Sequence, residues 1–214
     1  MTRQHLAEAY KTLGQAGLIA GSSGNISVRD GAGILISPTG TSPERITPEA
    51  IVAMSLDTPE PGASSEWPLH TALYQARPDL GAIVHTHADA YTALACLNEP
   101  LPIFHYAVLI FGGEIRCAPY VTFGTPELAT LTVAAMQDRT ACLLANHGMI
   151  TAAPTLPQAV AAALELERLC RQYLLARSAG TPRLLTHREV EAARTRLKTY
   201  QSSPFPLGHG QSEA

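Results

Sequence analysis

Apolar positions in the first part of the chain follow two different periods. Leu6, Tyr10 and Leu13 recur at helical spacing within residues 2–16, which predicts an amphipathic helix ended by a glycine. The short β-branched runs "NISVR" and "GILISP" then flank the turn residues "DGAG". That pattern is typical of a β-hairpin. We therefore expect one helix and one hairpin before residue 40.

Helical and extended patterns alternate after this hairpin. A helix is expected after Ser64, with a serine as its cap and Pro68 in its first turn. The runs "AIVHTH" and "ACLLANH" predict strands, whereas "ADAYTALACL" and "TPELATLTVAAMQ" predict helices. Strands interleaved with helices indicate an α/β domain in which helices cover a sheet, although the pattern leaves the strand order open.

The last third of the chain predicts two helices and a tail. A long helix is expected over residues 155–179, and Thr186 and Glu189 have the spacing of a capping box at the start of another. The proline-rich end has the composition of a loose tail. We therefore expect one sizeable globular domain over residues 1–200 and a C-terminal tail over residues 201–214.

Composition narrows the class of protein. The 214 residues are 46% hydrophobic, which is ordinary for a folded chain, and the net charge is −3. Because no basic block stands out, neither nucleic acid nor a membrane is expected as a partner. The start lacks a signal-peptide pattern, and no run of about 18 apolar residues occurs. We therefore expect a cytoplasmic protein with free cysteines.

Histidines are the first candidates for chemistry. His85 and His87, in "AIVHTHADA", would project from one face of a strand, about 7 Å apart at Cα. His147, in "CLLANHGMI", would end a second apolar strand and could supply a third imidazole, leaving one metal position open. Buried, hydrogen-bonded histidines without a metal fit the same pattern. His70, four residues after Glu66, is expected beside a ligand or on the surface.

Three hydroxyl-rich turns could bind an anion. They are "AGSSGNIS" at residues 20–27, "SPTG" at 37–40 and "SSE" at 64–66, the last before a helix N-terminus. Each could equally be an ordinary turn, and the P-loop and dinucleotide patterns are missing. Glu66 is either a helix-start glutamate stabilised by the dipole or a general base beside a metal.

Six quoted segments, taken together, resemble a known family. The series "GSSGNISVR", "ISPTG", "SSEWPLHTALYQARPD", "AIVHTHADAYTALACLNEPLPIFHY", "CAPYVTFGTPEL" and "LLANHGMI" is similar in order and spacing to the class II aldolase/adducin family, and within it to the fuculose phosphate aldolases. The resemblance runs from about Leu6 to Tyr200. It implies a single three-layer α/β domain, with a central, mainly antiparallel or mixed sheet covered by helices on both faces.

The resemblance also implies the roles of individual residues. One zinc ion per subunit, or another divalent metal, would be held by His85, His87 and His147, with Glu66 as the fourth ligand until substrate displaces it and then as the base. Tyr106 would reach the site of a neighbouring subunit in a homotetramer and donate a proton. The residues implied to bind phosphate are Ser22, Gly24, Asn25, Thr39, Gly40, Ser64 and Ser65, and those implied to shape the aldehyde pocket are Phe123 and Tyr200.

The implied reaction is reversible cleavage of a ketose 1-phosphate, L-fuculose 1-phosphate or a related 5-deoxypentulose 1-phosphate, to dihydroxyacetone phosphate and a small aldehyde. Methylthioribulose-1-phosphate dehydratase and sugar-phosphate 4-epimerase are alternatives of the same fold. Sequences that resemble the epimerase carry an aspartate after the double serine, whereas this chain has Glu66 there, in "SSE". A non-catalytic adducin-like interaction domain is a third reading. Ser22 and Ser23 stand where the fuculose phosphate aldolases resemble Thr-Ala, and the tail beyond Tyr200 differs in length and is richer in proline. These differences leave the identity of the aldehyde open.

Overall fold

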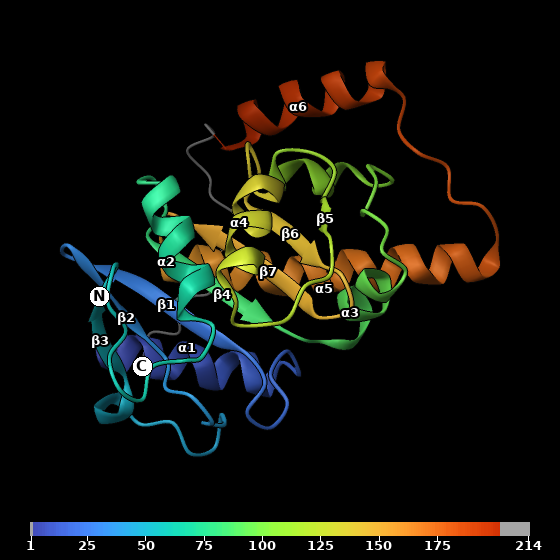
Figure 1. The fold of residues 1–214 in the computed structure, drawn as a ribbon. Helices are drawn as coiled ribbons and strands as arrows, with labels where there is room; N and C mark the ends of the chain where they lie inside the picture. Colours follow the sequence, from blue (N-terminus) through green and yellow to red (C-terminus); the bar gives the residue numbers. More distant parts are fainter. Residues whose placement is uncertain (1, 202–214) are drawn as a thin grey trace, which may run out of the picture.

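A seven-stranded sheet in the order β3-β2-β1-β4-β7-β6-β5 forms the centre of the computed structural model, which describes residues 2–201 (Figure 1). All neighbouring strands pair antiparallel except β5 and β6, so the expected mixed, mainly antiparallel sheet is confirmed. The strands are β1 (Asn25–Asp30), β2 (Gly33–Ile36), β3 (Val52–Ser55), β4 (Ala82–Thr86), β5 (Cys117–Ala118), β6 (Ala141–Leu144) and β7 (Gly148–Ala153).

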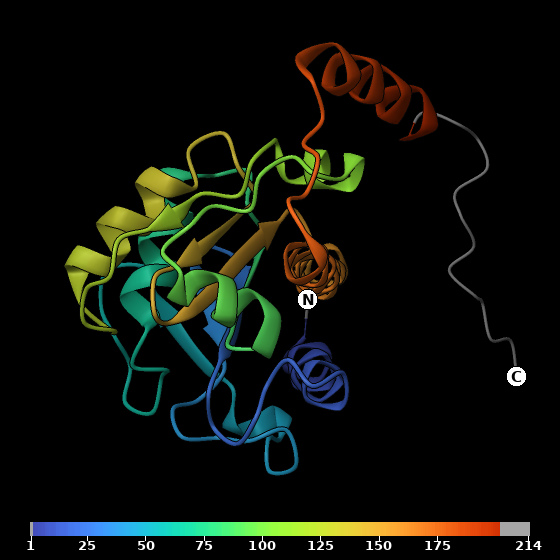
Figure 2. The ribbon, with the colours of Figure 1, turned by 90° about the vertical axis from the view of Figure 1, so that its right-hand side faces the viewer.

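Helices cover both faces of this sheet (Figures 1 and 2). They are α1 (Arg3–Gln15), α2 (Trp67–Ala76), α3 (Asp89–Cys96), α4 (Pro126–Ala135), α5 (Leu156–Ala179) and α6 (His187–Gln201), with short 3₁₀ helices η1 (Pro48–Ala50) and η2 (Tyr106–Phe111). One apolar core joins α1, α3 and α5 to the sheet, and a second joins α2 and α4 to its other face. The expected three layers are therefore present. No helix within the described range is long and apolar enough to span a membrane.

Several predicted elements form as their local signals indicate. The hairpin is β1–β2, and the helix predicted over residues 155–179 is α5. The capping box before α6 is reciprocal: Glu189 Oε2 accepts from the Thr186 amide at 2.8 Å, and the Glu189 amide donates to Thr186 Oγ1 at 3.4 Å. The predicted tail lies outside the described residues except Gln201, which ends α6.

The predicted serine cap of α2 is wrong. The helix begins at Trp67 with Glu66 as its N-cap, and no side chain caps it. The hydroxyl of Ser64 instead accepts the Glu66 amide at 3.3 Å, within the turn that precedes the helix. Glu66 therefore stands at the entrance to α2, where its side chain is free to turn toward the sheet.

Strand β7 was not expected from the sequence, and it changes the place of His147. The run after "ACLLANH" pairs with both β4 and β6, and residues 145–147 form the connecting turn, with Asn146 at φ 53°. His147 therefore lies in a hairpin turn rather than at the end of a strand. The unalternating, fully buried pattern of β7 gave no period-2 signal.

Alternation along β4 directs the histidine pair. Ile83 packs in the core that contains α2, whereas Val84 packs in the opposite core. His85 shares the side of Ile83 and so faces α2, the helix that Glu66 precedes. His87 follows one residue beyond the end of β4, where the chain turns into α3.

Candidate metal centre and its cavity

Four side chains that were predicted as metal ligands lie together. The ligating atoms of Glu66, His85, His87 and His147 are all within 4.8 Å of one another, and the ring centroids of the three histidines are 4.6–4.9 Å apart. They come from the N-cap of α2, from β4 and the residue just beyond it, and from the β6–β7 turn. Segments far apart in the sequence thus bring three nitrogens and a carboxylate to one place.

The donor set fits a divalent metal ion. His85 Nδ1 donates to the Met149 carbonyl at 2.8 Å, so in the neutral ring Nε2 carries a lone pair. That lone pair faces His87 Nε2 at 2.8 Å and Glu66 Oε2 at 2.9 Å. At these distances the atoms share either a proton or a metal ion, and the carboxylate favours a positive charge between them. A carbonyl that fixes the outer nitrogen of a histidine is also the usual partner of a metal-binding imidazole.

One oxygen of Glu66 supports the same conclusion. Glu66 Oε1 is buried without a hydrogen-bond partner among the described residues, and it lies 3.3 Å from His147 Nε2. A buried polar atom without a partner is uncommon in a folded protein. Three imidazoles and a carboxylate suit zinc and also accept manganese, cobalt or iron.

Burial and the charges within the cluster together shift the pKa values of these side chains. Burial, followed by the proximity of His85, lowers the pKa of His87 to about 3 and that of His147 to about 4. Burial raises the pKa of Glu66, but the charge and hydrogen bond of His85 outweigh it and hold this pKa well below its usual range. At neutral pH His87 and His147 are therefore neutral and Glu66 is ionised, as ligands must be. Burial lowers the pKa of His85, but the charge of Glu66 outweighs it and raises this pKa, so metal binding at His85 displaces a proton.

The cluster opens onto a polar cavity of about 300 Å³, which all the residues predicted to bind phosphate help to line. The lining residues are Ser22, Ser23, Gly24, Asn25, Pro38, Thr39, Gly40, Ser64, Ser65, Glu66, His87, Phe123 and His147. Phe123, which was predicted for the aldehyde pocket, is among them and is 63% exposed. The three hydroxyl-rich turns therefore surround one space beside the cluster.

Gly148 lets His87 approach the β6–β7 turn. A Cβ at this position would lie 2.4 Å from His87 Cδ2 and 2.5 Å from the Thr86 carbonyl oxygen. Both contacts are too short for real atoms, so any side chain here would displace the His87 ring or the end of β4. Glycine at this position therefore helps to set the geometry of the ligand set.

Gly148→Ala is expected to weaken metal affinity by about 10–100-fold, the range found when the surroundings of a ligand are disturbed. The affinity can be measured by competition with a chromogenic chelator. Gly180→Ala is the matched control, because a Cβ at Gly180 meets nothing within 4 Å. Equal affinity in both variants would show that Gly148 has no part in holding His87.

One residue predicted for the site, Tyr106, does not line this cavity, and another, Tyr200, is described only in its backbone. Tyr106 begins η2, is 55% exposed and stacks on His105 with 4.6 Å between ring centroids, but it does not line the cavity. Tyr200 lies in α6, and its side chain is outside the described part of the structure. The structure of one chain thus does not place Tyr106 beside the cluster.

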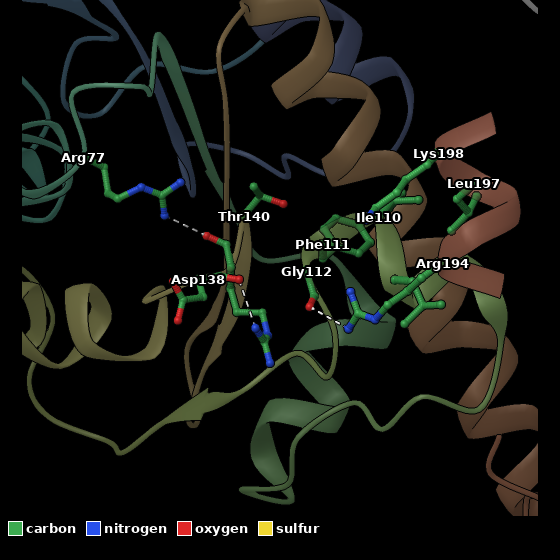
Figure 3. A pocket seen from close by; sticks show the side chains of 11 residues that line it. Arg77, Ile110, Phe111, Gly112, Asp138, Thr140, Arg194, Leu197 and Lys198 are labelled. Atoms are coloured by element: carbon green, nitrogen blue, oxygen red, sulfur yellow. Dashed lines mark hydrogen bonds between the residues drawn. The ribbon is translucent and has the colours of Figure 1, made fainter. Parts of the chain in front are cut away.

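A larger cavity of about 560 Å³ lies beside α6, which contributes Arg194, Leu197 and Lys198 to its lining (Figure 3). Three of its lining residues are arginines, and these already bond to backbone. Arg194, for example, donates to the Gly112 carbonyl at 3.2 Å, and Arg77 to the Arg139 carbonyl at 3.2 Å. None of its described lining residues is a histidine. The groups suited to catalysis are therefore in the smaller cavity.

The sequence left open whether His70 lies beside a ligand or on the surface, and the structure shows that it is buried. A surface position for it is wrong, because its side chain is completely buried and its Nε2 lies 2.5 Å from Asn25 Oδ1. Burial, followed by the charge of His85, lowers its pKa to about 3, so the ring is neutral. The spacing of four residues from Glu66 was the available signal, since it places His70 one helical turn along α2.

Comparison with known proteins identifies the family. Residues 4–174 match the model of the class II aldolase and adducin N-terminal domain. The chain is 43% identical to a 5-methylthioribulose-1-phosphate/5-deoxyribulose-1-phosphate aldolase of Rhodospirillum rubrum, over 92% of this chain and 91% of that protein. It is 41% identical to an L-fuculose phosphate aldolase of Escherichia coli, over 86% and 88% of the two chains.

A solved structure agrees with this result. An L-fuculose 1-phosphate aldolase superposes with a TM-score of 0.87 at 38% identity, covering 92% of this chain and 96% of that one. The matched region includes the whole glutamate and histidine cluster. The resemblance seen in the sequence is thus confirmed: the chain belongs to the class II aldolase and adducin family and is a lyase of the class II aldolase type.

Proposed function

We propose that the chain cleaves a 5-deoxypentulose 1-phosphate, 5-deoxyribulose 1-phosphate or its 5-methylthio analogue, reversibly to dihydroxyacetone phosphate and a small aldehyde. L-fuculose 1-phosphate is the second candidate substrate of the same reaction. The observation that carries the proposal is the cluster of Glu66 and three histidines beside a hydroxyl-lined cavity. The names of the relatives in Rhodospirillum rubrum and Escherichia coli support this choice of substrates.

The hydroxyl-lined end of the cavity would hold the phosphate. Ser64 and Ser65 directly precede α2, whose N-terminus favours a negative charge. Gly24, which also lines the cavity, has φ 116°, and a Cβ there would lie 3.0 Å from the His85 carbonyl oxygen. This glycine therefore lets the loop come close to β4 and presents backbone donors to the cavity.

Ser65→Ala tests the phosphate site. Loss of one hydrogen bond to a charged group, worth about 1.5–3 kcal/mol, should raise KM for the ketose phosphate by about 10-fold or more. Turnover at saturation should change less, because the serine does not contact the reacting carbon. Ser55→Ala, in β3 and outside the cavity, is the control. An unchanged KM in Ser65→Ala would remove Ser65 from the phosphate site.

A zinc ion, when bound by the three histidines, would supply positive charge that stabilises the negative charge developing on substrate oxygens. In the direction of synthesis, Glu66 removes a proton from the hydroxymethyl carbon of dihydroxyacetone phosphate. We assign that proton to Oε1, because Oε2 already accepts a hydrogen bond from Asn25 Nδ2 at 3.0 Å. In cleavage, Glu66 returns a proton to the same carbon.

The aldehyde oxygen needs a second proton donor during synthesis. Tyr106 is exposed and does not line the cavity of its own chain, which fits a role in the site of a neighbouring subunit. We therefore propose a homotetramer with the sites between subunits, in which Tyr106 serves the aldehyde oxygen and Phe123 and Tyr200 shape the aldehyde pocket. The domain of residues 1–200 would be the catalytic unit.

Product analysis tests the proposed reaction. The zinc-loaded chain is given 5-deoxyribulose 1-phosphate, its 5-methylthio analogue and L-fuculose 1-phosphate, and the products are identified. We expect dihydroxyacetone phosphate and the matching aldehyde in equal amounts. Loss of water without dihydroxyacetone phosphate would indicate the dehydratase instead, and inversion at one carbon would indicate the epimerase. A chain without turnover that binds less than about one zinc would fit an adducin-like interaction domain.

A further inference from the structure

A buried chain of hydrogen bonds leads away from Glu66 into the interior between β1 and α2. Glu66 Oε2 accepts from Asn25 Nδ2 at 3.0 Å, and Asn25 Oδ1 lies 2.5 Å from His70 Nε2. Beyond the ring, His70 Nδ1 lies 2.7 Å from the Ser27 hydroxyl. The side chains of His70 and Ser27 are fully buried, and Asn25 is 5% exposed.

The ionised carboxylate fixes the direction of every bond in this chain. Because a carboxylate only accepts, Asn25 presents its NH₂ group to Glu66 and its carbonyl oxygen to His70. His70 must then carry its hydrogen on Nε2 and leave Nδ1 to accept from the Ser27 hydroxyl. The Ser27 oxygen can in turn accept from the Tyr74 hydroxyl, 3.0 Å away.

These bonds act on one oxygen of the base. They hold Oε2, whereas Oε1 has no hydrogen-bond partner among residues 2–201. A carboxylate held on one side only cannot rotate without breaking a buried bond, which leaves an unsatisfied polar group and is costly. The orientation of Glu66 toward the histidine cluster therefore depends on Asn25, and the orientation of Asn25 depends on His70.

We propose that His70 is a positioning residue for the reaction: through Asn25, it holds the carboxylate of Glu66 in the orientation that leaves Oε1 open toward the histidine cluster. The inference rests on the proposed function of Glu66 as the base. Partners that orient a group next to a metal typically contribute about 10–100-fold to activity. His70 contacts neither substrate nor metal in this scheme, and its effect is transmitted by Asn25 alone.

Two substitutions of His70 separate positioning from packing. His70→Phe keeps a buried ring but removes the donor to Asn25, and kcat is expected to fall by about 10–100-fold with little change in KM. His70→Gln keeps an N–H that reaches Asn25 Oδ1 and is expected to restore most of kcat. The zinc affinity of His70→Gln, measured on the same samples, should equal that of the unmodified chain within error.

Thr151→Val is the matched control for the loss of a buried hydrogen bond. The Thr151 hydroxyl is fully buried and donates to the Ala159 carbonyl at 3.2 Å, away from the cavity. Its loss should lower Tm but leave kcat unchanged. A His70→Phe chain with normal kcat, or a His70→Gln chain as impaired as His70→Phe, would overturn the proposal.

The tautomer of His70 gives a readout that does not depend on activity or on the stability of a variant. In the zinc-loaded, unmodified chain with ¹⁵N-labelled histidine, NMR should show His70 with hydrogen on Nε2 and none on Nδ1. Hydrogen on Nδ1 would overturn the proposal, because Nε2 could then not donate to Asn25. If the chain cleaves no ketose phosphate, the proposed function fails, and the tautomer still decides whether His70 holds Asn25.

Discussion

Glu66→Gln is expected to lower turnover by about 10²–10⁴-fold, the range that a general acid or base contributes, while zinc content stays near that of the unmodified chain. Glutamine keeps the length of the side chain and an oxygen that can accept from Asn25 Nδ2. Its NH₂ group would take the place of Oε1, and an amide nitrogen cannot accept the proton from carbon. The substitution therefore removes the proton acceptor with little disturbance of the three histidines.

Kinetics and elemental analysis of the same preparation check this result. Glu60→Gln is the control, because Glu60 is exposed and does not line the cavity. Near-normal turnover in Glu66→Gln would show that another group moves the proton. Loss of zinc together with turnover would instead make Glu66 chiefly a ligand, and the assignment of the base would have to be withdrawn.

His85→Ala is expected to have the second large effect, on metal binding itself. His85 is fully buried, and the Met149 carbonyl fixes its ring. Its loss removes one direct ligand, so zinc affinity should fall by more than the 10–100-fold typical of an outer partner, and turnover should fall with it. Treatment of the unmodified chain with a chelator should have the same effect, and added zinc should reverse it.

Thermal unfolding measures this loss independently of catalysis. A ligand that binds only the folded state stabilises it by about 2.7 kcal/mol at a free concentration 100 times its Kd. Zinc should therefore raise the Tm of the unmodified chain and of a His187→Ala control, whose histidine is exposed at the start of α6. It should raise the Tm of His85→Ala much less. An equal rise in all three would place the metal elsewhere.

Local sequence signals predicted the helices α1 to α6 and the strands β1, β2, β4 and β6, but not the strands β3, β5 and β7. The capping box of Thr186 and Glu189 and the hairpin β1–β2 depend on residues close together in the chain, and both form as expected. The β6–β7 hairpin was missed because every residue of β7 is buried, so no alternation marks the strand. His147 was consequently assigned to a strand end rather than to a turn.

The geometry of the candidate site depends on pairing across the sheet, which a single sequence does not contain. Alternation predicted only that His85 and His87 project from one face of a strand, and the distance from His85 to Glu66 follows from the packing of α2 on that face. The link from His70 to Asn25 likewise joins residues 45 positions apart. The family resemblance supplied the grouping that the residue pattern alone left open.

Exchange of hydrogen at the hydroxymethyl carbon of dihydroxyacetone phosphate tests most directly whether Glu66 and the three histidines activate that carbon. The zinc-loaded chain is incubated in D₂O with dihydroxyacetone phosphate and without any aldehyde. We predict that one of the two hydrogens on this carbon is replaced by deuterium, and that Glu66→Gln gives no replacement. A zinc-loaded chain that binds the compound yet leaves both hydrogens in place would contradict the proposed aldol chemistry.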